Sequence, residues 1–343
     1  MLTQISLQNL ACFGEGDNHI DLAPETVIIG PNNVGKSAFI AGFNALHAFV
    51  HYGTWQWGMP RTYPWNSFDD IVHRHELGRE IHLGASVQGT DWSGAIHATV
   101  SRERGASLAH PRTSDMIREL DKVWLLRASR VELQHRTQIG SVGPYLPWQP
   151  LNPDGSNVIP YLLERYTSRD PHWAEAENWL KRIAPETSVL KAPLRVINAS
   201  VETADASQGV DINMAYQGTG IQKALSIIAA VVFSPEGSTI IIEEPETNLH
   251  PRSQESLVDL FNLAVRDWKK QVIFSTHSWD MLLPFASDIA TGSKRGEAHI
   301  RAEPENFKLV VLDRMGGDVK IHELDMKGKE FKDIRDYLKR LWG

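Results

Sequence analysis

Hydrophobic positions along this chain follow two spacings, one typical of strands and one typical of helices. Short apolar runs that end in glycine or polar residues predict buried strands, and apolar positions recurring every three or four residues predict helices. The pattern predicts strands at 5–7, 26–29, 80–87, 94–100, 122–126, 239–242 and 271–275, and helices at 36–49, 158–166, 172–183, 221–233 and 251–268. Strands interleaved with helices in this order are typical of an α/β fold.

Composition narrows the class of protein only slightly. The 343 residues are 42% hydrophobic and 22% charged, which is enough apolar material for a sizeable core. A net charge of −7 gives no general attraction to nucleic acid, although a local basic patch would still allow DNA binding. Cys12 is the only cysteine, so we expect a cytoplasmic protein without disulfides. We see no secretory signal, and the longest apolar run, 224–233, is shorter than the ~20 residues that span a bilayer.

A phosphate-binding loop is the most specific motif in the chain. Residues 30–37 read GPNNVGKS, which fits G-x-x-x-x-G-K-[ST] between an apolar run and a predicted helix. Backbone N–H groups of such a loop face one anion, and the positive end of the helix dipole adds to the attraction. We therefore expect ATP here, with Lys36 at the β- and γ-phosphates and the Ser37 hydroxyl on Mg²⁺. The predicted nucleotide-binding residues are Gly30, Asn32, Asn33, Val34, Gly35, Lys36 and Ser37.

Paired carboxylates follow the apolar run at 239–242. Ligands in open α/β sheets bind beyond the carboxyl ends of the strands, which is where Glu243 and Glu244 fall. We expect Glu243 to hold Mg²⁺, and Glu244 to accept a proton from the attacking water or to orient it. The alternative is an acidic helix cap or a solvated turn, and the phosphate loop makes that alternative less attractive.

Two further polar segments are less specific. The run 271–275 leads into His277, which could donate to a γ-phosphate oxygen, although a lone histidine at a strand end is more often structural. The turn Tyr216–Lys223 is rich in glycine and opens a helix, so it could form a second anion site or an ordinary turn. Its candidate residues are Gly218, Thr219, Gly220 and Gln222.

Taken in order, these four motifs resemble the ABC-type ATPase heads of the SMC/RecF-like group. More narrowly, the chain resembles the ATPase domain of the overcoming-lysogenization-defect (OLD) family. Residues 218–223 are similar to that family's G-x-G-x-Q-R, and residues 243–251 are similar to its E-E-P-E-x-H-L-H-P. The resemblance extends over nearly the whole chain, but its strong motifs cover only about forty residues.

The resemblance to this family implies a dimeric mechanism, which the spacing of the motifs alone does not predict. Two heads would enclose two ATP molecules, and the turn 218–220 of one head would contact the γ-phosphate bound by the other. Gln222 would belong to the same signature that faces the partner head. Asn248 and His250 would then lie in the loop at the dimer seam. ATP would thus join the chains into a homodimer or a higher oligomer, and hydrolysis would release them.

The chain also departs from the family pattern. Gly218 stands where many SMC-like heads carry serine, and Glu243 replaces the commoner aspartate. The segment 10–12 offers no arginine after the first strand, so we expect weaker γ-phosphate sensing and slow hydrolysis. Gln134 and Gln138 are the candidates for the usual lid-loop glutamine.

The resemblance implies one ABC-type P-loop ATPase domain over 1–343. Within it we expect an antiparallel β subdomain at 75–130, a helical insertion at 150–190, and a hairpin plus terminal helix at 300–343. OLD proteins usually continue into a metal-dependent Toprim nuclease after the strand that precedes His277. Only about sixty-five residues follow here, too few for another domain of ~100–150 residues, so we expect a separate chain to supply any nuclease.

Three functions remain open from the sequence. The first is a regulatory ATPase that controls a separate effector in prokaryotic antiviral defence or genome maintenance. The second is a stand-alone DNA-binding repair ATPase, and the third is a nucleotide-dependent scaffold with little turnover. The aromatic segment 52–68 could bind a partner or stack on bases, but its prolines favour a packed insertion.

Overall fold

The computed structural model describes most of the chain. The described residues are 1–16, 18–55, 65, 67–90, 92–127, 137–138, 150–185, 187–191, 198–199, 202–205, 211–287, 299–315, 317–324, 336–337 and 340. Gln134, Trp57 and most of the predicted terminal helix therefore lie outside the described residues. None of the helices in the described part is both long and apolar enough to cross a membrane.

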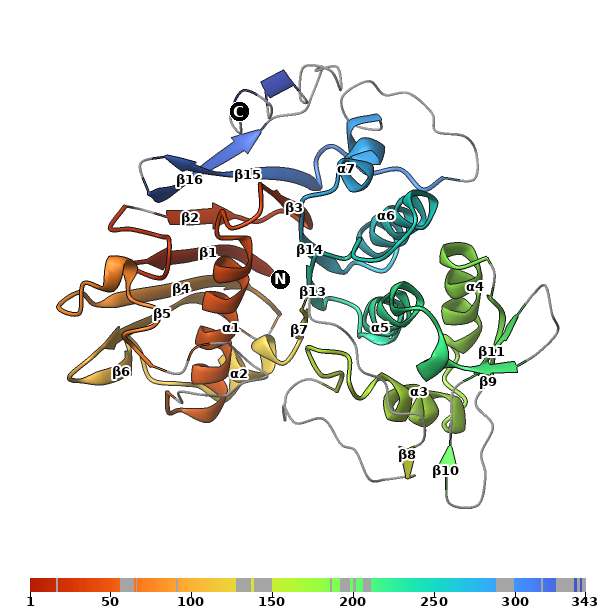
Figure 1. The fold of residues 1–343 in the computed structure, drawn as a ribbon. Coiled ribbons are helices and arrows are strands. Elements are labelled where there is room, and N and C mark those ends of the chain that lie inside the picture. The colour runs from red at the N-terminus through yellow and green to blue at the C-terminus, as the bar shows by residue number, and fades with distance from the viewer. Residues whose placement is uncertain are drawn as a thin grey trace.

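A six-stranded, mostly parallel sheet forms the centre of the molecule (Figure 1). Its strands lie in the order β16-β15-β3-β14-β13-β7. Only the pairing of β15 with β16 is antiparallel. The strands span Glu25–Ile29 (β3), Val123–Leu126 (β7), Thr239–Glu243 (β13), Gln271–Thr276 (β14), Phe307–Met315 (β15) and Asp318–Leu324 (β16).

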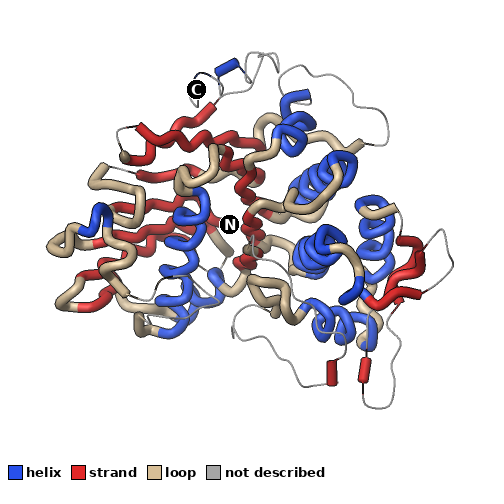
Figure 2. The backbone as a smooth tube through the Cα atoms, viewed as in Figure 1, coloured by secondary structure: helices blue, strands red, loops and turns tan. Residues whose placement is uncertain are grey.

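Side chains of this sheet alternate between two hydrophobic cores. Ile240 and Ile242 point into one core, whereas Ile241 between them belongs to the other. A strand buried on both faces reads as a continuous apolar run, which is why the sequence predicts β13 so clearly. Helices pack on one face, as Figure 2 shows: α3 (Val158–Thr167), α4 (Trp173–Ile183), α5 (Thr219–Phe233), α6 (Pro251–Arg266) and α7 (Trp279–Phe285).

The opposite face packs against α1 (Lys36–Tyr52) and a second, antiparallel sheet. That sheet has the order β2-β1-β4-β5-β6. Its strands are β1 (Leu2–Gln8), β2 (Asn18–Asp21), β4 (Ile81–Gln88), β5 (Ser93–Ser101) and β6 (Gly105–Leu108), with α2 (Ser114–Leu120) following. Trp55 stacks edge-on against Phe49 at the end of α1, as expected of a packed aromatic.

Two boundaries differ from the prediction. The antiparallel sheet is not confined to 75–130, because the N-terminal strands β1 and β2 complete it. Conversely, β7 lies inside that range but pairs with β13 in the parallel sheet. Pairing partners far apart in sequence decide sheet membership, so the run at 122–126 could not reveal which sheet it joins.

Smaller elements occupy the region between α2 and α5. The two-residue strands β8 (Thr137–Gln138) and β10 (Asn198–Ala199) pair with each other. Strands β9 (Thr187–Lys191), β11 (Glu202–Asp205) and β12 (Asp211–Asn213) form a separate three-stranded sheet. The short 3-10 turn η2 (Met214–Tyr216) also lies in this region, whereas a second one, η1 (His73–His75), lies between α1 and β4. Gln138, one candidate for the lid loop, thus belongs to β8.

Candidate functional site

The phosphate loop connects β3 to α1 at the carboxyl edge of the parallel sheet. Gly35 and Asn33 have φ angles of 115° and 64°, so the loop turns through the left-handed region. A Cβ atom on Gly30 would lie 2.7 Å from Val34 Cγ1, and one on Gly35 would lie 2.6 Å from Cys12 Sγ. Packing therefore favours glycine at both positions of the motif, and at Gly35 the backbone conformation favours it as well.

Lys36 lies folded across its own loop. Its Nζ donates to the carbonyl oxygens of Gly30 at 2.7 Å and Pro31 at 2.9 Å, and the side chain is buried. Burial lowers the pKa of Lys36, while the charges of Glu244, Glu246 and Glu243 oppose that change. The ammonium group thus faces a set of carboxylates, and an incoming phosphate can replace its two carbonyl partners.

Glu244 is placed by an unusual backbone conformation. Its φ of 46° lies in the left-handed region, which a glutamate rarely adopts outside functional sites. Its N–H donates to the Ser275 carbonyl at 2.9 Å, and this bond ties the end of β13 to β14. Glu244, Lys36 and Ser37 line one cavity of about 670 Å³, a size that suits a small-molecule ligand.

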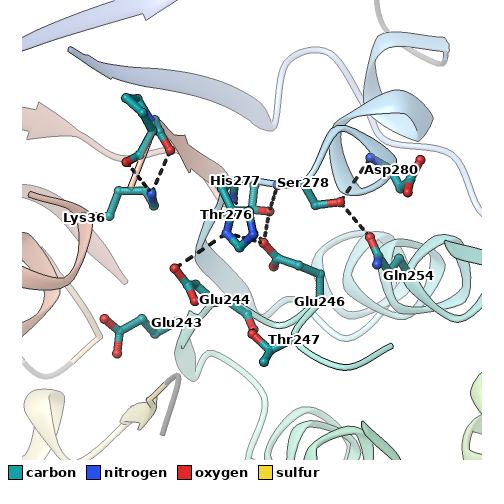
Figure 3. A network of polar contacts seen from close by, with 12 residues as sticks. Lys36, Glu243, Glu244, Glu246, Thr247, Gln254, Thr276, His277, Ser278 and Asp280 are labelled. Atoms are coloured by element: carbon teal, nitrogen blue, oxygen red, sulfur yellow. Dashed lines mark hydrogen bonds and ion pairs between the residues drawn. The ribbon is translucent and has the colours of Figure 1, made fainter. Parts of the chain in front are cut away.

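His277 and Glu244 lie beside each other at the adjoining strand ends (Figure 3). His277 Nδ1 is 3.7 Å from Glu244 Oε1 and 3.4 Å from Glu246 Oε1. Glu246 Oε1 also accepts from Thr276 Oγ1 at 2.6 Å and from the His277 N–H at 3.1 Å. Glu246 therefore joins the acidic motif to the histidine motif, a role that we did not predict although the residue lies within the E-E-P-E sequence.

Lys223 is a second buried cation behind the carboxylates. Its Nζ donates to the carbonyl oxygen of Arg127 and to that of Glu243, the latter at 3.3 Å. Burial lowers its pKa to about 8, against the opposing charges of Glu243, Glu246 and Glu244. The helix that carries the glycine-rich turn is thus connected to the acidic strand of the same chain.

The oxygen donors in this region fit a magnesium ion. Ser37 and Glu243 would supply a hydroxyl and a carboxylate, the hard oxygen ligands that Mg²⁺ takes alongside phosphates and water. Ser37 lines the cavity, whereas Glu243 is buried and is not among the lining residues. Glu246 Oε2 is buried and has no hydrogen-bond partner among the described residues. Within the described segments, no group of three or more His, Cys, Asp or Glu side chains could hold a metal alone.

The two glycines of the signature turn have different surroundings. Gly218 precedes α5 with nothing within 4 Å of a Cβ position, and no side chain caps the helix. A Cβ on Gly220 would instead collide with the Asn248 carbonyl oxygen. The turn therefore packs against the loop 244–250 of its own chain and leaves its first residue open to solvent.

Gln222 does not face outward, contrary to the expected contact with a partner. Its side chain is buried, and Nε2 donates to the Gln217 carbonyl at 3.0 Å and the Met214 carbonyl at 3.3 Å. Burying a primary amide requires such acceptors, so the turn itself uses this side chain. Asn248 and His250 are exposed, and the His250 ring accepts the Arg252 N–H at the start of α6.

Comparison with a family model and with solved structures indicates the class of protein. A family model described as an AAA ATPase domain matches residues 156–282. The fold is that of an SMC head: one solved head bound to the C-winged helix domain of ScpA has a TM-score of 0.61 at 11% identity, covering 97% of this chain and 99% of that one. A Pyrococcus furiosus-derived SMC head with an extended coiled coil, bound to the C-terminal domain of ScpA, gives 0.57 at 11% identity, covering 99% and 98%.

Curated relatives with shorter matches are ATP-binding proteins of a transporter. The energy-coupling factor transporter ATP-binding protein EcfA2 of Mycoplasma capricolum is 28% identical over 74 residues, covering 22% of this chain and 25% of that protein. EcfA2 of Mesoplasma florum is 28% identical over 141 residues, covering 35% and 44%. The matches thus span less than half of these relatives. Together the comparisons support ATP binding and hydrolysis by a P-loop ATPase domain of the ABC/SMC type.

Proposed function

We propose that this chain is a cytoplasmic regulatory ATPase that dimerises around Mg²⁺-ATP and controls a separate effector protein. One observation carries the proposal. The phosphate loop and Glu244 line the same cavity, and His277 Nδ1 lies 3.7 Å from Glu244 Oε1. Three motifs distant in the sequence converge there, as phosphoryl transfer to water requires.

Each group has a defined part in hydrolysis. Lys36 exchanges its carbonyl partners for the β- and γ-phosphate oxygens, and loop N–H groups hold the remaining charge. Ser37 and Glu243 would hold Mg²⁺, which would neutralise charge on the phosphates. Glu244 accepts a proton from the attacking water, and His277 donates a hydrogen bond to a γ-phosphate oxygen. Glu246 fixes the position of His277 through the backbone N–H.

Dimerisation rests on exposed groups in the signature turn and in the loop that follows Glu244. The free N-terminus of α5 carries no cap and no acidic residue in its first turn, so its N–H groups can receive an anion. Gly218 and Thr219 would meet the γ-phosphate of a partner chain, with Asn248 and His250 at the seam. The SMC heads of similar fold were solved bound to domains of another protein, ScpA, which supports a separate partner here as well.

The biological setting comes from the resemblance to OLD ATPases. It points to prokaryotic antiviral defence or genome maintenance, with a nuclease on another chain as the effector. Direct DNA binding by the ATPase is the alternative. A binding measurement with duplex DNA and no effector protein tests this alternative. It is favoured if the logarithm of the binding constant falls linearly with the logarithm of the salt concentration.

Mass photometry of the Glu244→Gln protein tests the proposal. Removing the base should leave ATP bound but uncleaved, so the dimer fraction should rise with ATP and Mg²⁺ and fall without either. Lys36→Ala in the same background is the control, and it should stay monomeric. An unchanged monomer with and without ATP in the Glu244→Gln protein would contradict nucleotide-gated dimerisation.

A further inference from the structure

The phosphate loop has two different neighbours across the parallel sheet. Strand β3, which leads into the loop, pairs with β14 on one side and with β15 on the other. The acidic strand ends lie on the β14 side. Strand β15 also runs parallel to β3, with Val311 opposite Ile29, so its carboxyl end at Arg314 reaches the same edge of the sheet. The loop thus lies between an acidic side and the β15–β16 hairpin.

Two arginines on the hairpin side face the nucleotide cavity. Arg74, Arg314 and Cys12 line the cavity together with Lys36 and Ser37. We call Arg74 and Arg314 the basic wall. The hairpin packs against the phosphate loop, since a Cβ on Gly35 would lie 3.2 Å from Val319 Cγ2 and one on Gly30 would lie 2.8 Å from the Leu312 carbonyl oxygen.

Asp318 holds Arg74 in the basic wall, whereas Arg314 Nε donates to the Gly317 carbonyl oxygen at 3.2 Å. Arg74 Nη2 donates to Asp318 Oδ1 at 2.9 Å, and His73 Nε2 lies 3.0 Å from the same oxygen. His73 Nδ1 lies 2.8 Å from the Ala11 carbonyl oxygen, so this contact joins three separate chain segments. Although burial acts to raise it, the pKa of Asp318 lies below its usual value because Arg74 and His73 interact with the carboxylate.

The backbone at Arg74 supports a functional reading. Its φ of 53° and that of His75 at 55° place two consecutive non-glycine residues in the left-handed region, a conformation that costs free energy and tends to occur at ligand sites. The ion pair to Asp318 occupies one terminal nitrogen of Arg74, and a guanidinium carries five N–H donors. Donors therefore remain for a ligand.

The orientation of the nucleotide follows from this arrangement. Hydrolysis places the γ-phosphate beside Glu244, on the acidic side of the loop. The rest of the molecule must then extend toward the hairpin, where guanidinium groups match phosphate oxygens in geometry and charge. We propose that Arg74 and Arg314 bind the α-phosphate of the nucleotide and supply the cations that residues 10–12 lack. This inference rests on the proposed function and names two residues outside every motif.

Equilibrium titration in the Glu244→Gln background tests the basic wall. Arg74→Ala and Arg314→Ala should each raise the Kd for Mg²⁺-ATP by about tenfold or more, as expected for loss of a charge-assisted hydrogen bond. Inorganic tripolyphosphate should lose affinity to a similar extent, because it also places a third phosphate at the wall. Arg74→Lys should recover part of the loss, and Asp318→Asn should weaken binding less than Arg74→Ala.

Arg104→Ala is the matched control, because it also removes an arginine that forms an ion pair, here with Glu80. Arg104 is exposed and does not line the cavity. ATP affinity equal to the control in both wall variants would overturn the proposal. Loss for ATP but not for tripolyphosphate would overturn the assignment to the α-phosphate and move the contact to the nucleoside. Failure of the parent Glu244→Gln protein to bind ATP would instead overturn the proposed function.

Discussion

The two sides of the phosphate loop differ in chemistry and in how the chain builds them. On the acidic side, Glu243, Glu244 and Glu246 come from one short segment, and Figure 3 shows them together with His277. On the basic side, Arg74 and Arg314 lie 240 residues apart, and Asp318 anchors Arg74. Catalytic groups must keep fixed mutual geometry, which contiguous strand ends provide. Groups that only bind can be contributed from distant surfaces.

This difference explains what the sequence could and could not predict. The α/β fold was predicted correctly, because β3, β13 and β14 read as apolar runs and each has a recognisable motif at its end. The basic wall carried no such signal, because only tertiary packing brings the hairpin to the loop. Gln222 shows the same limit: its motif position suggested a partner contact, and burial against Met214 and Gln217 became visible only in the structure.

The largest expected effect separates catalysis from binding. Glu244→Gln should lower kcat by about 10²–10⁴-fold, the usual contribution of a general base, with little change in ATP affinity. The wall variant Arg74→Ala should do the reverse, with raised KM and a largely retained kcat. Steady-state phosphate release measures both quantities. If Glu244→Gln altered KM alone, the assignment of chemistry to the acidic side would be wrong.

Glu246 should be the next most sensitive position. Glu246→Ala removes the acceptor for the Thr276 hydroxyl and the His277 N–H, and it should lower kcat by about 10–100-fold. Glu246→Gln keeps an acceptor oxygen and should lose less. Partial unfolding would also lower the measured kcat with KM preserved, so the rate is divided by the concentration of ATP-binding chains. A positioning role predicts a lower rate per ATP-binding chain, whereas simple unfolding would leave that rate unchanged.

The signature turn offers a stability test on a matched pair of glycines. Gly220→Ala forces the Cβ against the Asn248 carbonyl and should reduce the free energy of unfolding by about 1–3 kcal/mol. Gly218→Ala, with open space around it, should change it by only about 0.5 kcal/mol. Urea unfolding of both variants checks this prediction. Equal losses would show that the two positions do not differ as described.

The smallest expected effect is a pH dependence of stability that comes from the buried lysine Lys270. The pKa of Lys270, like that of Lys223, is lowered to about 8 by burial, but Lys270 donates to the Val231 and Val232 carbonyls at the end of α5. Between pH 8 and 9 the unfolded chain retains a proton that folded Lys270 releases, so unfolding free energy should rise with pH. The slope is at most about 1.4 kcal/mol per pH unit for one proton.

Lys270→Met should remove this one-proton contribution to the slope and leave kcat nearly unchanged. Lys269→Met is the control, because Lys269 is exposed and pairs with Glu236 on the surface. Urea unfolding at pH 7.5, 8.5 and 9 gives the slopes. A parallel pH dependence in wild type and Lys270→Met would mean that Lys270 does not titrate in this range.

The central claim is that one nucleotide is held between the phosphate loop and the acidic strand ends. Isothermal titration calorimetry with Mg²⁺-ATP, comparing Glu244→Gln protein with and without Lys36→Ala, tests it most directly. We predict saturable heat at one site per chain for Glu244→Gln and loss of that signal when Lys36 is replaced. Absence of binding in the parent protein, or equal binding after replacement of Lys36, would contradict the account.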